Sequence, residues 1–207
     1  MINFGDSLRD VRTSTWTVMM FGRRITAKVS RDADDINSWV NGVYGFHGRR
    51  ICEGRLVAGL GVQWRPGSGP AGREPTAVVQ ICVGRRCLIV QLGRCSKVPS
   101  ALKSFLEDGR VTFTGVGISD DVRRLGFREL QVGNPREVRK MAVAKYGPQW
   151  SNASMGNLAD QVLGINGVTK GRRVGCSNWD AEVLSSAQVQ YACEDAYLAF
   201  RLGLSLV

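Results

Sequence analysis

The chain has 207 residues, of which 43% are hydrophobic and 22% charged, an ordinary composition for one globular domain with a sizeable core. Its formal net charge is +10, from 28 Lys and Arg against 18 Asp and Glu, and this excess favours polyanionic partners. No apolar run approaches the roughly 20 residues of a transmembrane helix, and the first residues lack a signal-peptide hydrophobic region. We therefore expect an intracellular protein of the cytoplasm or nucleus that has no membrane partner.

The first half of the chain is predicted to be rich in β-structure. β-Branched and aromatic residues on either side of Gly22 predict a hairpin, and an acidic start predicts the first helix. Gly84-Arg85-Arg86 is a tight-turn signal between two later strands. The expected elements are a hairpin over Trp16–Ser30, a helix over Asp32–Tyr44, and strands over Leu56–Trp64, Ala77–Val83 and Cys87–Leu92.

The second half is predicted to be mainly helical. Pro99 stands at the first turn of one predicted helix, where its missing N–H costs nothing. The expected elements are a strand over Val111–Ile118 and helices over Pro99–Asp108, Asp120–Phe127, Pro135–Tyr146, Ser154–Leu163 and Ser186–Leu204. This order predicts an α/β fold with one mixed sheet flanked by helices. No internal repeat or low-complexity segment suggests a second domain, so residues 1–207 are expected to form one domain.

The cysteine and histidine content excludes several kinds of site. The six cysteines lie in mostly apolar surroundings, and their spacing does not match a zinc site, so buried free thiols are expected. The single histidine, His47, lies in a Gly-rich stretch ahead of the predicted core. A histidine-dependent hydrolase mechanism is therefore not expected.

Asp195 lies four positions after Tyr191 in the last predicted helix, so the two side chains lie on one helix face. A carboxylate can hold a divalent cation while a phenol one turn away orients a water molecule. The pair alone is also common on ordinary amphipathic helices. Its interpretation depends on the rest of the chain.

A second acidic motif lies upstream, where an apolar strand turns through Gly115 and Gly117 into a helix that starts with Asp120 and Asp121. Capping of free backbone N–H groups is one explanation for Asp at a helix start. A site shared with Asp195 is the other explanation.

Together these stretches resemble the DEDD superfamily of 3′-5′ exonucleases, in the subgroup with a tyrosine in the last motif, and most closely the Werner-syndrome-exonuclease-like proteins of plants. The resemblance extends over residues 56–204, and the hairpin and helix within residues 1–50 are expected to belong to the same domain. The stretches that carry it are Leu56–Pro66, Val79–Leu92, Gly115–Leu125, Leu158–Gly164 with Lys170, and Ser177–Asp180 leading into Tyr191 and Asp195. The family implies a ribonuclease H-like fold and a site for two Mg²⁺ or Mn²⁺ ions.

The first family motif, Asp-x-Glu, is absent, because this chain has Gly61-Val62-Gln63 at that place. The resemblance implies that Asp195 is the one direct metal ligand left. It also implies that Asp121 positions the second metal through water and that Tyr191 orients the attacking water. Gly61 and Gln63 mark the missing acidic ligands.

A site without these acids has lost both negative charge and fixed geometry, so we expect weak or absent hydrolysis. Among neighbouring acidic residues, only Asp120 lies in a segment flexible enough for its carboxylate to replace a missing ligand. Acid-to-glycine and acid-to-amide exchanges suit both a natural departure and a substitution introduced to trap a substrate.

Candidate nucleic-acid contacts lie near these motifs. They are Trp64, directly after the first motif, and the basic residues Arg123, Arg124 and Lys170. Trp64 can stack on a base or pack at the rim of the core, and packing is the simpler interpretation.

The sequence thus favours a protein that binds DNA or RNA 3′ ends and has impaired chemistry. The alternatives are an active 3′-5′ exonuclease and an interaction or assembly subunit that no longer binds nucleic acid.

Overall fold

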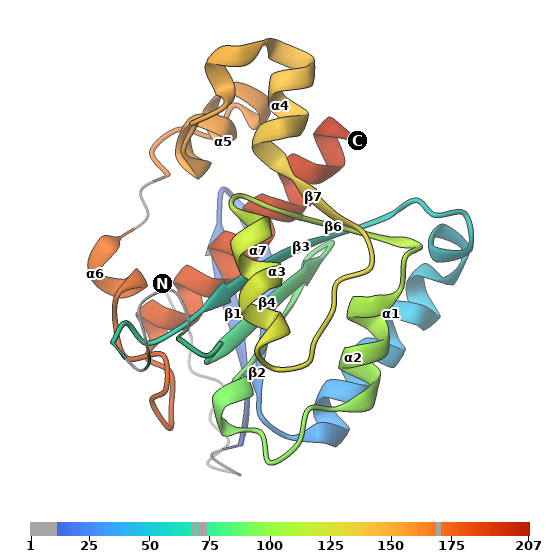
Figure 1. The fold of residues 1–207 in the computed structure, drawn as a ribbon, viewed down its shortest axis with the longest axis vertical. Helices are drawn as coiled ribbons and strands as arrows, with labels where there is room; N and C mark the ends of the chain where they lie inside the picture. Colours follow the sequence, from blue (N-terminus) through green and yellow to red (C-terminus); the bar gives the residue numbers. More distant parts are fainter. Residues whose placement is uncertain (1–11, 68, 70–73, 169–170) are drawn as a thin grey trace.

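A computed structural model describes residues 12–207 apart from 68, 70–73 and 169–170, and its described part is one α/β domain built on a seven-stranded sheet (Figure 1). The strands are β1 (Thr13–Met20), β2 (Arg23–Ser30), β3 (Leu56–Gln63), β4 (Val78–Val83), β5 (Arg86–Val90), β6 (Val111–Gly115) and β7 (Pro135–Glu137). The helices are α1 (Ala33–Cys52), α2 (Ser100–Glu107), α3 (Ile118–Gly126), α4 (Val138–Tyr146), α5 (Met155–Leu163), α6 (Arg172–Gly175) and α7 (Ser186–Leu206), with short 3₁₀ turns at Leu92–Arg94 and Pro148–Trp150.

The sheet is mixed, as predicted, with the strand order β1-β2-β5-β4-β3-β6-β7. The β1–β2, β3–β4 and β4–β5 pairs are antiparallel, whereas β2–β5, β3–β6 and β6–β7 are parallel. The amino ends of β2, β3, β5 and β6 therefore share one edge, and their carboxyl ends share the opposite edge.

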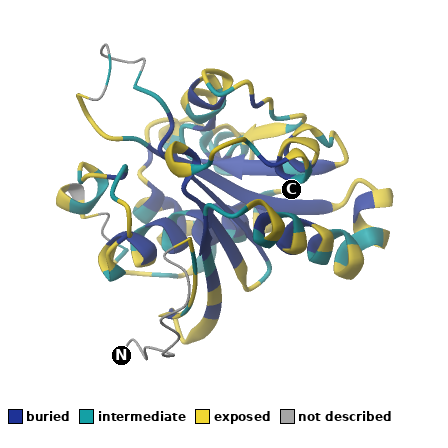
Figure 2. Ribbon diagram, turned by 90° about the horizontal axis from the view of Figure 1, so that it is seen from below, coloured by how far each residue is buried: buried dark blue, intermediate teal, exposed yellow. Residues whose placement is uncertain are grey.

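Two layers of helices cover this sheet. Helices α1 and α2 pack on one face of the sheet and form a hydrophobic core with it. Helix α7 packs on the other face and forms a second core with residues of β1, β2, β4 and β5. Every residue of β3 is buried, and Figure 2 shows the central strands as the buried centre of the molecule. No described helix is both long and apolar enough to cross a lipid bilayer.

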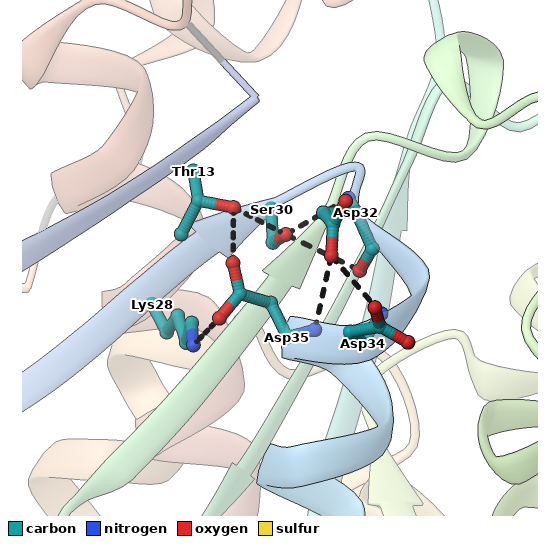
Figure 3. A network of polar contacts seen from close by, with 6 residues as sticks. All are labelled: Thr13, Lys28, Ser30, Asp32, Asp34 and Asp35. Atoms are coloured by element: carbon teal, nitrogen blue, oxygen red, sulfur yellow. Dashed lines mark hydrogen bonds and ion pairs between the residues drawn. The ribbon is translucent and has the colours of Figure 1, made fainter. Parts of the chain in front are cut away.

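A polar network fixes the start of α1 against the first hairpin (Figure 3). Asp32 Oδ1 accepts hydrogen bonds from the N–H groups of Asp34 (3.0 Å) and Asp35 (3.2 Å), as an N-cap residue does. The Asp35 carboxylate also pairs with Lys28 of β2 and accepts a hydrogen bond from Thr13 of β1. These contacts join both strands of the hairpin to the helix.

The prediction that this helix ends at Tyr44 was wrong, because α1 continues to Cys52 and includes His47. Glycines at three positions of this segment lowered its expected helix propensity. Burial of Val43 and Ile51 against the sheet outweighs that cost. His47 therefore lies on a helix and not in a loop.

The prediction of a single helix over Pro135–Tyr146 was also wrong at its start, because residues 135–137 form β7 and α4 follows it. Proline is compatible with the first residue of an edge strand, where its missing N–H is not needed by the ladder. The short strand pairs with β6, with Phe113 opposite Pro135.

All six cysteines are free. Cys82, Cys87 and Cys193 are buried, and burial raises the pKa of the Cys82 and Cys87 thiols. Cys52 and Cys176 are exposed, so the expectation of buried thiols holds for only part of the set.

Helix α7 approaches β3 closely at Gly59. A β-carbon at residue 59 would lie 1.9 Å from the carbonyl oxygen of Ala196 and 2.4 Å from the backbone nitrogen of Phe200. Neither backbone atom can move without displacing the helix. The absence of a side chain at residue 59 is therefore a condition of this packing.

We expect Gly59→Ala to lower the free energy of unfolding by about 3 kcal/mol or more, because the added methyl group overlaps helix backbone. Urea unfolding followed by circular dichroism measures the loss. Gly45→Ala on α1 is the control, since a β-carbon there meets nothing within 4 Å and should raise stability by up to about 1 kcal/mol. A Gly59→Ala protein as stable as the parent would contradict the packing described.

Candidate active site

The carboxyl end of β3 and the middle of α7 bring Gly61 and Asp195 together. The close contact at Gly59, two residues earlier on the same face of the strand, sets the helix at this distance. A β-carbon at Gly61 would lie 2.6 Å from Asp195 Oδ2. The structure thus places two of the predicted site positions next to each other.

Gln80 of β4 completes this contact and was not predicted. It lies opposite Gly61 in the β3–β4 register and is fully buried. Its Nε2 donates a hydrogen bond to Asp195 Oδ2 at 3.0 Å and would lie 2.6 Å from a β-carbon at residue 61. The amide therefore occupies the space above Gly61. A single amide residue in the otherwise apolar strand Val78–Val83 was the signal available in the sequence.

Only the nitrogen of the Gln80 amide has a hydrogen-bond partner among the described residues. Its Oε1 is buried and has no hydrogen-bond partner among the described residues. A buried amide oxygen without a partner carries a desolvation cost of about 1–3 kcal/mol. The hydrogen bond to Asp195 is thus the contact that orients this side chain.

Asp121 lies in the first turn of α3 and is half-buried. The N-cap residue of this helix is Gly117, which has no side chain to cap the free N–H groups. The carboxylate of Glu137 has this role, since its Oε2 accepts hydrogen bonds from the N–H groups of Gly117 (2.9 Å) and Ile118 (3.1 Å). Glu137 was not predicted to have this role, because residues 135–137 were predicted as helix and not as β7.

Asp120 points away from this interior. Its side chain is 75% exposed and pairs with Arg123 at 3.2 Å. In this position it is not a replacement for the acids missing from residues 61 and 63.

Tyr191 lies one helical turn before Asp195 on α7 and is half-buried. Its ring packs at a tilt against Trp179, with 5.9 Å between centroids. A β-carbon at Gly175 would lie 2.8 Å from the Tyr191 hydroxyl oxygen, so the end of α6 contacts this side chain. Trp179 is 1% exposed and belongs to the hydrophobic core.

Gln63, the other position of the first motif, is the last residue of β3 and is 7% exposed. Its side chain is neutral. Together with Gly61 it leaves the carboxyl end of β3 without a negative charge.

Two of the predicted nucleic-acid contacts bind each other within the protein. The guanidinium of Arg124 lies over the Trp64 ring, 3.6 Å from its centroid. Arg124 Nη1 also lies 3.1 Å from Glu74 Oε2, with both side chains largely buried. These contacts join α3 to the segment that follows β3, and they give Trp64 and Arg124 a structural role.

The remaining basic candidates differ in position. Arg123 is exposed on α3 beside Asp120. Lys170 lies outside the described residues. Their contacts with nucleic acid stay predictions.

A known protein family matches the larger part of the chain. Residues 65–207 match the family model described as 3′-5′ exonuclease. The chain belongs to the 3′-5′ exonuclease family. This family, part of the DEDD superfamily, acts on nucleic acids. The match to the family model begins just after β3 ends at Gln63, so the strand that carries Gly61 and Gln63 lies outside it.

Curated relatives support the same family. The chain is 33% identical to the mouse bifunctional 3′-5′ exonuclease/ATP-dependent helicase WRN over 153 residues, which are 72% of this chain and 10% of that protein. It is 29% identical to a 3′-5′ exonuclease of Arabidopsis thaliana over 198 residues, which are 92% of this chain and 66% of that protein. The chain therefore spans less than two thirds of the length of these relatives.

Solved structures confirm the ribonuclease H-like fold. RNase D of Escherichia coli superposes with a TM-score of 0.70 at 15% identity, over 86% of this chain and 43% of that chain. NrnC of Brucella melitensis gives a TM-score of 0.60 at 21% identity, over 72% of this chain and 71% of that chain. Another structure of NrnC contains bound Mg²⁺.

The family depends on divalent metal ions, but the residues of this exonuclease-family chain do not fit a two-metal site. Residue 61 has no side chain, Gln63 is neutral, and Asp195 Oδ2 accepts a hydrogen bond from an amide. Among the described residues, no group of three or more His, Cys, Asp or Glu side chains is arranged to hold a metal. Mg²⁺ sites ordinarily combine carboxylates with substrate phosphates, and here the carboxylates are too few.

The structural role of Arg124 can be tested by measuring the free energy of unfolding of a variant that lacks its side chain. We expect Arg124→Ala to lower the free energy of unfolding by about 2–4 kcal/mol, because it leaves Glu74 without its buried partner. Arg123→Ala, on the exposed side of the same helix, should change it by no more than about 0.5 kcal/mol. Thermal unfolding of both variants measures the difference. Equal losses would contradict the assignment.

Proposed function

We propose that this chain is a nucleic-acid-binding member of the 3′-5′ exonuclease family that hydrolyses phosphodiester bonds weakly or not at all. The observation that carries the proposal is the place of the Gln80 amide. It fills the space beside Gly61 and binds the carboxylate of Asp195.

Hydrolysis by two metal ions needs cations about 3.5–4 Å apart, held by carboxylates that offset their charge. At the carboxyl end of β3 this chain offers a glycine and a glutamine. Asp195 remains, but one of its oxygens is engaged by an N–H donor that a cation would have to displace. The residues present therefore do not support a metal-dependent step.

Binding of nucleic acid does not need the missing carboxylates. The net charge of +10 favours contacts with phosphates, and the family acts on nucleic acids. We propose 3′ ends of DNA or RNA as the ligands, with Tyr191, Asp195 and Asp121 lining the place of the terminal nucleotide.

Two alternatives lead to different measurements. An active exonuclease needs a replacement ligand, and Asp120, the candidate from the sequence, is exposed and paired with Arg123. The alternative of an assembly subunit that does not bind nucleic acid gives no reason for the net charge of +10.

The proposal is tested by restoring the first motif with Gly61→Asp and Gln63→Glu. The aspartate side chain introduced by Gly61→Asp has to displace the ends of the Gln80 and Asp195 side chains, both of which can rotate. We expect degradation of a 5′-labelled strand with Mg²⁺ or Mn²⁺ to rise about 100-fold or more over the parent chain. Asp195→Ala in the restored background should abolish the gain.

A neutral variant of similar size, Gly61→Asn, is the matched control, because it displaces Gln80 without adding charge. It should stay as inactive as the parent. Isothermal titration with Mn²⁺ gives a second measurement, in which the restored variant binds the ion and the parent and Gly61→Asn do not. Parent activity equal to that of the restored variant would contradict the loss of hydrolysis. Failure of the parent to bind any 3′-ended strand at low salt would favour the assembly role.

A further inference from the structure

Three of the five Arg-Arg pairs in the chain lie at the edge of the sheet opposite the candidate active site. They belong to the start of β2, the end of α1 and the β4–β5 turn. All six side chains are exposed. We call this surface the basic edge and define it by Arg23, Arg24, Arg49, Arg50, Arg85 and Arg86.

Strand pairing brings the first and last of these pairs together. Thr26 of β2 lies opposite Arg86 of β5, and its backbone N–H donates to the carbonyl oxygen of Arg85 at 2.9 Å. Arg24 is two residues before Thr26, on the same face of β2.

The end of α1 lies over the same turn. The guanidinium carbon of Arg86 is 5.6 Å from the centroid of the Phe46 ring, and a β-carbon at Gly42 would lie 3.4 Å from Arg86 Nη1. Phe46, His47 and Arg86 line one small hollow with Val43 and Val83. Arg49 and Arg50 follow in the next turn of the helix.

Positive charge at this edge is weakly compensated. The sequence has no Asp or Glu within residues 11–31, 36–52 or 75–106, which contain all six arginines. Glu53 is near, and it pairs with Arg49 and Arg55. The other five arginines have no ion-pair partner among the described residues. Burial lowers the pKa of His47, and the charges of Arg50 and Arg86 lower it further.

The basic edge is far from the candidate site. β3 starts at this edge with Leu56 and ends at the site with Gln63. Eight residues at about 3.3 Å each separate the two edges by about 25 Å. A ligand at the basic edge therefore does not contact Asp195.

We propose that the basic edge binds a segment of single-stranded nucleic acid, at a second site apart from the one for the 3′ end. Arginine side chains present planar, bidentate donors that match phosphate oxygens. The Phe46 ring is 78% exposed and offers a face on which a base can stack beside these phosphates. The large exposed apolar residues near this edge are Phe46 on α1 and Met19 and Phe21 at the turn of the first hairpin. An anionic membrane is therefore the rival ligand, and vesicle binding by the arginine variant distinguishes it.

His47 is the single histidine of the chain, so its ring protons give an isolated NMR signal at the basic edge. Titration of the full chain with oligo(dT) or oligo(U) of about 20 nucleotides should shift this signal and raise the pKa of His47, since bound phosphates offset the field of Arg50 and Arg86. An unchanged His47 signal at saturating oligonucleotide would overturn the proposal. This readout is independent of hydrolysis at the candidate site.

The second test removes three charges, with Arg24→Ala, Arg50→Ala and Arg85→Ala combined. We expect affinity for the oligonucleotide to fall at least tenfold and the slope of log affinity against log salt to decrease by about 2. The matched control removes the same charge from exposed lysines elsewhere, with Lys97→Ala, Lys103→Ala and Lys140→Ala. Phe46→Ala alone should weaken binding about fivefold or more if a base stacks there.

Equal loss of affinity in the arginine and lysine triple variants would overturn the proposal, because it would show a general effect of net charge. Binding of phosphatidylserine vesicles that the arginine variant loses, with oligonucleotide affinity unchanged, would replace nucleic acid by a membrane surface. Loss of oligonucleotide binding in Asp195→Ala and Tyr191→Ala, without loss in the arginine variant, would restrict binding to the candidate site.

Discussion

The backbone contact between α7 and β3 at Gly59 determines where the functional groups of this protein lie. Because residue 59 has no side chain, the carbonyl of Ala196 and the amide of Phe200 rest directly on the strand. That approach sets Asp195 above residue 61, where any side chain has to share space with the carboxylate. The same approach recurs near the end of the helix, where Gly203 lies against Thr114 and the Thr114 hydroxyl donates to the carbonyl oxygen of Ala199 at 2.8 Å. The chemistry available at the site follows from this packing.

Next to this contact, the amide of Gln80 stabilises the carboxylate of Asp195. A hydrogen bond from a neutral donor to a charged acceptor contributes about 1.5–3 kcal/mol when the acceptor is sheltered from water. The interaction is compatible with a folded protein and needs no cation to hold Asp195 in place. The fold therefore holds Asp195 in place through a neutral partner. Family membership rests on residues 65–207, which do not include Gly61 and Gln63.

The sequence predicted the sheet well because its strands are marked by strong local signals. β3, β4 and β5 are apolar runs bounded by Gly and Pro, and their predicted ranges differ from the observed ones by at most two residues at either end. Where the predicted bounds or type of an element were wrong, tertiary contacts determined the observed structure. α1 continues past Tyr44 because its apolar residues are buried, and residues 135–137 are a strand because β6 offers an edge. Gln80 and the basic edge were missed because register and topology, which propensity does not encode, bring their parts together.

Glu137 joins two helices that the sequence alone treats as independent. Its Oε2 closes the start of α3, and its Oε1 accepts a hydrogen bond from the N–H of Arg139 at the start of α4. One carboxylate thus completes two helix ends, and the positive ends of both dipoles meet on it. The position of the turn that carries Asp121 is consequently linked to that of α4 through the Glu137 carboxylate.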